Sequence, residues 1–535
     1  MSFDKFLVSS QLGNQNMKPY EAKIDQESLA KAANQLWALL SPKLSYLAPE
    51  KRDFVRLAFD FMVEMHAEQR RKSGDFYIIH PVNAAITLAE IEFDKESIAA
   101  ALLHDVPEDV CKKPTEGIKL IEREFGAETA FLVAGITKLS VIRYLGEKKQ
   151  VENLRKLFVA MSKDLRVIFI KLADRIHNLR TLKSVPPDKA RRIALESLEI
   201  YAPIAERLGV GSLRSQLEEA AFGYAYPTES KYYLSLPDLD YNKRTKQVEK
   251  LVKKTTSILD QNNMPYLKIT GRAKHHYSTF KKVTLEAKPL DQIYDLVALR
   301  IITNSVSNCY KTLSLLHEHF EVLPERLKDY IQEPKDNGYQ SIHLTVKDPK
   351  SGLTFEYQIR TQRMHEYAEY GVAAHWWYKE NLTGDDRENW LTKKSFQWIQ
   401  SLIDLEQKYA PEVEYMKNVR LNLYPDRIFV LTPQNDVIDL PKGASPIDFA
   451  YKIHEDVGSH AVMAKINGKI AKLNEELQNG DIVEIVTSRN QKPNADWLNW
   501  AKSGSSMKKI RAFLRNIGVN FVAKDDHEKD KKKHL

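Results

Sequence analysis

Cysteine is scarce in this 535-residue chain, and long apolar runs are missing from it. The two cysteines, Cys111 and Cys309, stand far apart and outside any paired spacing, which excludes a disulfide framework and a cysteine zinc site. No stretch approaches the roughly 20 apolar residues that span a bilayer, and the N-terminus lacks the apolar core of a signal peptide. We therefore expect a cytoplasmic protein without a membrane partner.

The overall composition is that of globular protein, with 43% hydrophobic and 28% charged residues. A chain of this length is too long for one core, so three or four domains are expected. The formal net charge of +8 suits nucleotide phosphates or RNA, although surface lysines alone give the same total.

One short segment combines a histidine with three carboxylates. His104 and Asp105 end an apolar run, and Glu108 and Asp109 follow three and four residues after Asp105. On one helix these four side chains share a sector of the surface, where they need a cation or water. The alternative to a metal or water site is an amphipathic helix whose polar end is simply solvated. Pro107 should kink or end this helix.

Two further residues complete a candidate metal site. His80 follows an apolar run at 77–79, and Asp174 interrupts an apolar face in the segment 171–182. Two histidines and two aspartates suit manganese, iron or zinc better than calcium.

The region around these residues is predicted to be almost entirely helical, over segments 29–40, 52–71, 81–91, 119–136 and 194–210. A helical domain with His80, His104, Asp105 and Asp174 in this order resembles the HD phosphohydrolase domain. The segments RRKSGDFYIIHP, LLHDVPEDV, GITKLS and KLADRIHNLRTL resemble the hydrolase half of the RelA/SpoT family, which removes pyrophosphate from the 3′ position of the alarmone (p)ppGpp.

This resemblance implies a role for each motif residue. The manganese ligands would be His80, His104, Asp105 and Asp174. Glu108 and Asp109 would activate and steer the attacking water. Contacts to base, ribose or phosphate would come from Arg71, Lys72, Ser73, Asn178 and Thr181, each of which also has a plain reading as a surface or capping residue.

Three positions depart from the family pattern in the loop before His80. Glu68 stands at a usual glycine, and Asp75 and Phe76 stand at a usual Glu-Pro pair. These changes concern nucleotide affinity rather than the metal ligands.

After a charged helical connector that ends near residue 254, the pattern becomes that of an α/β domain. Strand-like segments are 267–283, 294–303, 343–348 and 353–361, with helices at 308–320 and 363–380. In the last strand Phe355, Tyr357 and Ile359 alternate with Glu356, Gln358 and Arg360, so the two sets should face opposite sides of the sheet. Taken alone, the pattern of Glu356, Gln358 and Arg360 is typical of a row of solvent-facing side chains.

Cationic residues crowd into the same domain, at Arg272, Lys274, Lys282, Arg300, Lys328 and Lys335. Such a set of guanidinium and ammonium groups suits polyphosphate. The turn at Asn337 and Gly338 places the ring of Tyr339 to stack on a base.

The segments GRAKHHYS, YDLVALR, RLKDYI, PKDNGYQSIH and EYQIRT resemble, in this order, the synthetase motifs of the same family, which transfers pyrophosphate from ATP to the 3′-hydroxyl of GDP or GTP. The resemblance implies that Asp295 binds magnesium and that Glu356 accepts the 3′-hydroxyl proton or touches the metal. Tyr339 would stack on guanine, and Lys335 and His343 would steady the acceptor phosphates. ATP and its phosphates would contact Arg272, Lys274, Ser278, Lys282 and Arg300. The Arg-x-Lys-Asp sequence that contains Lys328 is the form found in members with both activities.

The C-terminal part contains a unit at 424–489 that resembles the β-grasp TGS domain. In long family members this domain reaches the acceptor end of uncharged tRNA on the ribosome. His454 and His460 are the candidate contacts, although the family's histidine after Asp-Val-Gly is Ser459 here. The regulatory modules that usually come later do not follow, which leaves open a shortened chain or a naturally short member.

The predicted fold is therefore multidomain: an all-α HD hydrolase domain, an α/β mixed-sheet synthetase domain and a small β-grasp TGS domain. The expected boundaries are a leader at 1–30, the hydrolase domain at 31–222, the synthetase domain with its connector at 223–382, a linker at 383–423, the TGS domain at 424–489, and a helical segment with a charged tail at 490–535.

A bifunctional alarmone enzyme is the favoured hypothesis. One weak site, more readily the hydrolase, is an alternative, and a ribosome- or tRNA-binding sensor with secondary enzymatic activity is another. Because two opposing sites running together would waste ATP, we expect the domains to exchange between arrangements in which one site is competent. The choice between GDP and GTP and the oligomeric state stay open.

Overall fold

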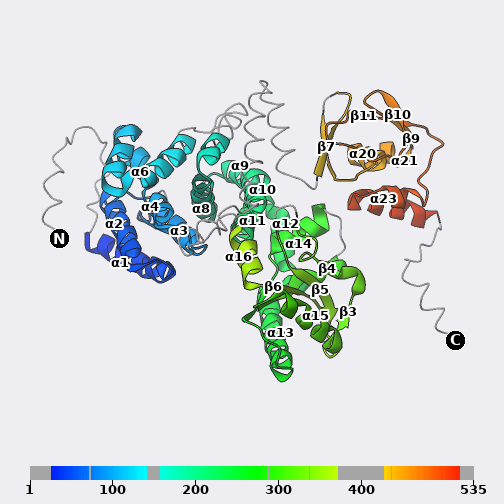
Figure 1. Cartoon of the computed structure of the whole chain (residues 1–535). Helices are drawn as coiled ribbons and strands as arrows, with labels where there is room; N and C mark the ends of the chain where they lie inside the picture. Colours follow the sequence, from blue (N-terminus) through cyan, green and yellow to red (C-terminus); the bar gives the residue numbers. More distant parts are fainter. Residues whose placement is uncertain are drawn as a thin grey trace.

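The computed structural model describes residues 26–71, 74–140, 157–285, 290–335, 338–371, 427–434 and 436–517. The predicted linker at 383–423, the charged tail beyond residue 517 and residues 1–25 of the leader predicted at 1–30 lie outside these ranges. Residues 26–30 of that expected leader belong to helix α1 (Gln26–Leu40) instead. Within them the predicted fold class is confirmed, with a helical part, a mixed sheet and a small third unit (Figure 1). No helix in the described ranges is both long and apolar enough to cross a membrane.

The regular elements among the described residues of the first part are all helices, and one isolated bridge joins Arg70 and Phe76. Its apolar faces enclose a single core, and α3, α4 and α8 pack together at its centre. The main helices are α1 (Gln26–Leu40), α2 (Pro49–Met65), α3 (Ile79–Ala89), α4 (Lys95–Leu103), α5 (Val106–Asp109), α6 (Pro114–Ser140), α8 (Arg166–Arg180), α9 (Pro187–Glu196), α10 (Ala202–Arg207), α11 (Gly211–Ala225) and α12 (Pro227–Ser235).

The expected single helix from the apolar run to Asp109 is wrong. Helix α4 ends at Leu103, and α5 begins at Val106 with Pro107 in its first turn. Proline has no N–H to continue the hydrogen-bond ladder, as the caution on this residue anticipated. His104 and Asp105 therefore lie at a junction between two helices.

The predicted helix 52–71 is also too long. Helix α2 ends at Met65, and the next residues turn back so that His66 and Gln69 contact the segment before α3. This turn brings the loop that precedes His80 against α5, since Gln69 Nε2 donates to the carbonyl of Asp109 at 2.8 Å.

The second part is a six-stranded mixed sheet with the order β1-β2-β6-β5-β3, and β4 pairs with β5. Strands β2 and β6 are parallel and the other pairs are antiparallel. The strands are β1 (Lys268–Ala273), β2 (Val297–Thr303), β3 (Glu321–Val322), β4 (Lys328–Asp329), β5 (Ile342–Lys347) and β6 (Thr354–Thr361). The expected strand at 267–283 is thus correct only to Ala273, because helix α14 (His276–Phe280) follows.

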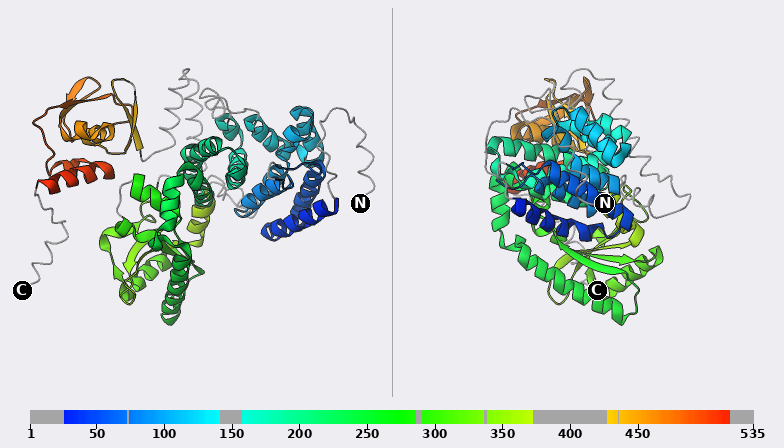
Figure 2. Two further views of the ribbon diagram at one scale, coloured as in Figure 1. Left: turned by 180° about the vertical axis from the view of Figure 1, so that it is seen from behind. Right: turned by 90° about the vertical axis from the view of Figure 1, so that its left-hand side faces the viewer.

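One face of this sheet is apolar and is covered by α13 (Tyr241–Gln261) and α15 (Val306–His319), as Figures 1 and 2 show. Phe355, Tyr357 and Ile359 are fully buried there. The alternation in β6 places Glu356 and Arg360 on the opposite face, as predicted from strand parity. Arg360 is nevertheless only 1% exposed, because α16 (Gln362–Tyr370) covers that end of the polar face.

Helix α16 also attaches the sheet to the helical domain. Ser212 Oγ on α11 donates to the carbonyl of Glu369 at 3.3 Å. Tyr370 packs against the helical core, and the backbone of Gly371 approaches that of Gly209. Helix α16 therefore lies between the polar face of the sheet and the helical domain and contacts both.

The third part contains a hairpin of β7 (Arg427–Leu431) and β8 (Val437–Pro441) and a small sheet with the order β10-β9-β11. The remaining elements are β9 (Ala461–Ile466), β10 (Lys469–Ala471), β11 (Val483–Thr487), α20 (Pro446–Ile453), α21 (Glu455–Ser459), α22 (Trp497–Trp500) and α23 (Gly504–Asn516). Asp448 accepts hydrogen bonds from the backbone N–H groups of Ser445, Lys502 and Ser503, so α20 holds the segment that leads into α23.

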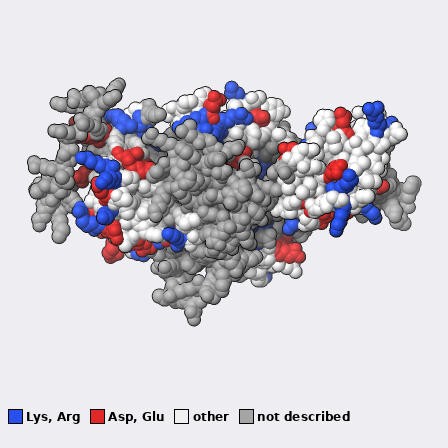
Figure 3. Space-filling model, turned by 90° about the horizontal axis from the view of Figure 1, so that it is seen from above, with Lys and Arg blue, Asp and Glu red and all other residues white. Residues whose placement is uncertain are grey.

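Basic and acidic side chains are interspersed over the described surface that Figure 3 shows. The net positive charge is therefore not concentrated on the described part of that face.

Candidate active sites

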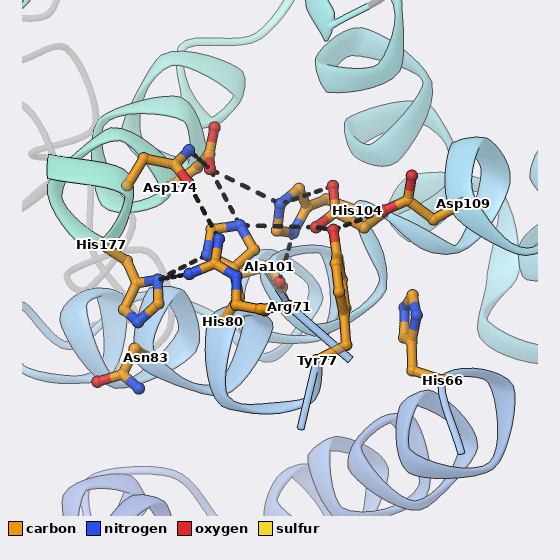
Figure 4. Close-up of polar contacts among 12 residues, drawn as sticks. His66, Arg71, Tyr77, His80, Asn83, Ala101, His104, Asp109, Asp174 and His177 are labelled. Atoms are coloured by element: carbon orange, nitrogen blue, oxygen red, sulfur yellow. Dashed lines mark hydrogen bonds and ion pairs between the residues drawn. The ribbon is translucent and has the colours of Figure 1, made fainter. Parts of the chain in front are cut away.

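Four side chains converge inside the helical domain (Figure 4). His80 lies on α3, His104 and Asp105 lie at the α4–α5 junction, and Asp174 lies on α8. His80 Nε2 is 3.5 Å from Asp105 Oδ2 and 3.2 Å from Asp174 Oδ1, and His104 Nε2 is 3.2 Å from Asp105 Oδ1 and 4.0 Å from Asp174 Oδ1. His80, His104 and Asp105 each offer one ligand atom within 4.8 Å of the others, and Asp174 Oδ1 lies beside both imidazoles. Two imidazoles and two carboxylates are donors that suit a divalent transition metal.

Neighbouring groups turn both imidazoles so that Nε2 faces this centre. His104 Nδ1 donates to the carbonyl of Ala101 at 2.8 Å, and His104 Nε2 is buried with no hydrogen-bond partner in the described part of the chain. His80 Nδ1 is 2.7 Å from His177 Nδ1, to which Arg71 also donates at 3.4 Å. His177 Nδ1 is thus the acceptor, and His80 Nε2 keeps its lone pair for a metal.

Three of the five residues expected at the nucleotide lie together beside the metal ligands. Arg71 donates to Thr181 Oγ1 at 3.1 Å and to Asn178 Oδ1 at 3.3 Å. Asn178 in turn donates to Asp174 Oδ1 at 2.5 Å. The other two, Lys72 and Ser73, lie outside the described residues.

The two acidic residues of α5 have different surroundings. Glu108 Oε1 is buried and has no hydrogen-bond partner among the described residues, so it is available to a water or substrate. Asp109 Oδ2 accepts a hydrogen bond from the hydroxyl of Tyr77.

On the polar face of the sheet, one carboxylate is held between two lysines. Asp295, just before β2, pairs with Lys274, and its Oδ2 is 2.7 Å from Lys282 Nζ. Asp295 Oδ1 is buried with no hydrogen-bond partner in the described ranges, which suits a magnesium ligand. Ser278 lies half-buried on α14 between these two lysines in sequence.

Glu356 is the second carboxylate of this face. It accepts from Gln358 Nε2 at 2.8 Å and lies 3.4 Å from His343 Nδ1. Tyr339 OH lies 2.8 Å from His343 Nε2, so the aromatic residue expected at guanine and the catalytic candidate Glu356 share one histidine. The ammonium of Lys335 sits 5.4 Å from the centre of the Tyr339 ring.

The remaining cations surround this group. Arg272 is exposed on β1, and Lys328 is exposed on β4 opposite His343. Arg300 Nη2 on β2 is 2.9 Å from Glu369 Oε1 on α16, which also lies 3.1 Å from Arg360 Nη2. The sheet thus presents a cationic surface with carboxylates at Asp295 and Glu356, whereas Glu369 closes the end near α16.

Three family models match the chain: the HD domain over residues 58–211, the region found in RelA / SpoT proteins over 271–383, and the TGS domain over 428–487. The chain is 43% identical over 462 residues to the probable guanosine-3′,5′-bis(diphosphate) 3′-pyrophosphohydrolase of Synechocystis sp., covering 86% of this chain and 60% of that protein. It is 40% identical over 474 residues to the bifunctional (p)ppGpp synthase/hydrolase SpoT of Escherichia coli, covering 88% of this chain and 66% of SpoT.

The chain belongs to the RelA/SpoT family. It spans roughly three fifths to two thirds of the length of these two relatives. Among solved structures, the small alarmone synthetase 1 of Bacillus subtilis bound to its product pppGpp matches 34% of this chain and 95% of its own, with 26% identity and a TM-score of 0.24.

The charge states in the helical site of this RelA/SpoT protein follow from burial and neighbours. Burial alone would raise the pKa of Asp105, but His104 and His80 hold it below its usual range. Burial would also raise the pKa of Asp174, but the Lys171 ammonium and His80 hold this pKa well below its ordinary value. Burial and the Asp105 charge raise the pKa of Glu108 to about 7, which suits a group that exchanges a proton near neutral pH.

On the sheet face, burial would raise the pKa of Asp295, but Lys274 and Lys282 hold it well below the usual range. Burial would likewise raise the pKa of Glu356, which His343 and Gln358 lower. Both carboxylates are therefore ionised at neutral pH. Burial and the neighbouring Arg360 lower the pKa of Arg300 to about 10, which still leaves the guanidinium charged.

Several residues at the two RelA/SpoT sites were not predicted from the sequence. His177 orients His80, and its position three residues after Asp174 on the same helix was an available signal. Tyr77 and Glu369 offered no such signal, because their partners are distant in the chain. Asp105 lies 28 residues from Tyr77, and Arg300 lies 69 residues from Glu369.

In the TGS unit, both candidate histidines lie at the ends of α21. His454 is exposed, and its Nδ1 accepts from the backbone N–H of Asp456 at 3.2 Å. His460 is half-buried, and its Nδ1 donates to the carbonyl of Asp456 at 2.8 Å. Ser459, at the usual histidine position, is the last residue of α21.

Proposed function

We propose that this chain is a bifunctional alarmone enzyme. It hydrolyses the 3′-pyrophosphate of (p)ppGpp in the helical domain and transfers pyrophosphate from ATP to the 3′-hydroxyl of GDP or GTP on the sheet. The observation that supports this proposal most is the presence of two chemically different centres, an imidazole–aspartate cluster and a cationic face with two carboxylates. Its nucleotide substrates place the reaction in the cytoplasm.

In the hydrolase site, His80, His104, Asp105 and Asp174 would hold manganese. When bound, the ion supplies Lewis acidity and lowers the pKa of a bound water. Glu108, whose pKa is about 7, takes the proton of the attacking water, a contribution of roughly 10²- to 10⁴-fold.

The nucleotide would lie beside this centre. Arg71, Asn178 and Thr181 are linked by hydrogen bonds and present a cation and two polar groups. Asp109 steers the attacking water, since its carboxylate lies on the same short helix as Glu108. Lys72 and Ser73 complete the expected contacts.

In the synthetase site, Glu356 accepts the proton of the 3′-hydroxyl, and the resulting oxygen attacks the β-phosphorus of ATP as AMP departs. Tyr339 stacks on guanine, and Lys335, His343 and Lys328 face the acceptor phosphates. Arg272, Lys274, Ser278, Lys282 and Arg300 bind ATP. Magnesium at Asp295 would neutralise phosphate charge, and the rest of the acceleration comes from alignment and cations.

Two substitutions test both activities. The purified chain is incubated with ATP, GDP and manganese, and the nucleotides are separated by chromatography over time. Asp105→Ala should abolish alarmone breakdown and retain synthesis, whereas Glu356→Ala should do the reverse, so each variant is the folding control of the other. If neither substitution changes nucleotide turnover, the bifunctional proposal fails and the sensor reading is preferred.

We also propose that the TGS domain contacts uncharged tRNA on the ribosome. The match to the TGS family model and the exposure of His454 at one end of α21, with His460 at the other, support this partner. In filter binding with uncharged tRNA, His454→Ala should weaken the affinity, whereas the exposed His317→Ala on α15 should not. Equal affinities for both variants would remove the assignment.

A further inference from the structure

The hydroxyl of Tyr77 lies between two carboxylates of the hydrolase centre, which share its single proton as acceptors. It lies 2.8 Å from Asp105 Oδ2 and 2.5 Å from Asp109 Oδ2 (Figure 4). Asp105 belongs to the proposed metal ligands, and Asp109 belongs to the pair proposed to handle the attacking water. One side chain from outside the α4–α5 segment therefore sets the distance between a ligand and a water-handling group.

The ring of Tyr77 is held on two sides. It stacks on His66, with ring centres 4.8 Å apart and planes inclined by 23°, and it meets His80 edge-on at 6.3 Å. His66 is fully buried, and the backbone N–H of Tyr77 donates to the carbonyl of Gln69 at 3.1 Å. The position of the hydroxyl is therefore determined by ring packing and backbone bonding that do not involve the hydroxyl itself.

The same loop also holds the backbone of Asp109. Gln69 Nε2 donates to the Asp109 carbonyl at 2.8 Å, and Gln69 Oε1 lies 2.7 Å from His66 Nδ1. Asp109 is thus fixed at its main chain by Gln69 and at its carboxylate by Tyr77.

The other oxygen of Asp105 already has a fixed direction. Asp105 Oδ1 lies 3.2 Å from His104 Nε2, and Oδ2 contacts Tyr77. Without the Tyr77 hydroxyl, the Asp105 carboxylate can rotate away from the metal centre, and Asp109 loses its side-chain tether. Partners that orient ligands in this way typically change metal affinity or activity by about 10- to 100-fold.

We propose that Tyr77 is a positioning residue of the hydrolase site. Its hydroxyl orients Asp105 towards the metal ion and keeps Asp109 at a set distance from it. This inference rests on the proposed hydrolase function.

Tyr77→Phe tests the inference because it removes the hydroxyl and keeps the ring that packs on His66. The matched control is Tyr46→Phe in the same domain, which removes a hydroxyl that donates to the carbonyl of Phe93 at 2.6 Å, away from the site. Hydrolysis of (p)ppGpp is measured at saturating MnCl₂. Binding of Mn²⁺ to the nucleotide-free chain is measured by calorimetry, and synthesis and thermal unfolding report folding.

For Tyr77→Phe we expect the kcat of hydrolysis to fall about 10- to 100-fold with KM within about twofold, and the Kd for Mn²⁺ to rise about tenfold. Synthesis should be unchanged, and Tyr46→Phe should match the wild type in all assays. A kcat within twofold of wild type, a loss carried by KM, or an unchanged Mn²⁺ affinity would each overturn the role of Tyr77.

The failure of the proposed function has a different signature. In that case the wild-type chain itself breaks down no (p)ppGpp. The calorimetric comparison of wild type with Tyr77→Phe still decides whether Tyr77 orients a metal ligand, because it requires no turnover.

Discussion

Replacing Glu369 by glutamine should weaken the fold and strengthen ATP binding at the same time. Glu369 Oε1 contacts Arg300 Nη2 at 2.9 Å and Arg360 Nη2 at 3.1 Å. Burial would raise the pKa of Glu369, but these two arginines hold it below its usual range, so the carboxylate is charged at neutral pH. Arg300 is also a proposed ligand of the ATP phosphates, and with that role Glu369 would compete with the nucleotide for this guanidinium.

The structure sets the size of the stability effect. Removing one partner of a buried ion pair costs about 3–5 kcal/mol, because the other charge remains buried. The Glu369 side chain is 27% exposed and Arg360 is 1% exposed, and glutamine retains one carbonyl acceptor. We therefore expect the free energy of unfolding to fall by about 1–3 kcal/mol.

The effect on nucleotide binding has the opposite sign. Without the competing carboxylate, the KM for ATP in synthesis should fall about three- to tenfold, which corresponds to about 0.7–1.4 kcal/mol. Steady-state synthesis with varied ATP measures the KM, and calorimetric unfolding measures the stability. Glu366→Gln is the matched control, because Glu366 lies on the same helix and accepts a local hydrogen bond from Gln362.

An unchanged or higher KM for ATP in Glu369→Gln, together with lower stability, would refute this reasoning. Glu369 would then orient Arg300 or simply stabilise α16. A loss of stability as large in Glu366→Gln would show that the effect belongs to the helix and not to the arginine pair.

Three further predictions concern other parts of the molecule. Asp174→Asn should weaken Mn²⁺ binding more than tenfold in calorimetry and abolish hydrolysis, with synthesis retained. Burial would raise the pKa of Asp348, but its ion pair with Lys254 at 2.6 Å lowers this pKa. The stability that this ion pair contributes should be complete above about pH 3.9 and lost as the pH falls through the lowered folded-state pKa. Asp348→Asn should remove this part of the acid dependence of urea unfolding. Gly371→Ala should lower the thermal unfolding temperature, because Gly371 has a φ of 54° and a β-carbon there would overlap the carbonyl of Leu208, a strain of about 1–3 kcal/mol or more. An unchanged melting curve for Gly371→Ala would contradict this explanation, and an unchanged acid dependence of urea unfolding for Asp348→Asn would contradict the other.

Helix α16 contacts both domains. Its Glu369 side chain contacts the arginines of the sheet, and its backbone accepts a hydrogen bond from Ser212 on α11. The expected exchange between arrangements with one competent site predicts that a nucleotide bound at one site changes the affinity of the other. Calorimetric titration of each site with and without ligand at the other measures this coupling, and equal affinities would remove the idea.

The local periodicities in the sequence were sufficient for much of the fold. The alternation in β6 has a period of two residues, and this period alone separates Glu356 and Arg360 from the buried Tyr357. Pro107 interrupts the expected continuous helix for a reason contained in a single residue: without an N–H it cannot donate to the carbonyl of Leu103, where α4 ends, and it lies in the first turn of α5. Where the signal required knowledge of packing, as for the end of α2 or the helix α14, the predicted boundaries were wrong.

The sequence by itself determined the chemical types at both centres, since histidines, aspartates and a cationic strand face are properties of composition and spacing. Only the tertiary structure decided which distant side chains meet them. Tyr77 reaches Asp105 across a helix junction, and Glu369 reaches Arg300 from a helix that covers the sheet. Such contacts depend on the rotation and docking of whole elements, which the burial of all apolar faces sets together, and no local window of the chain contains that information.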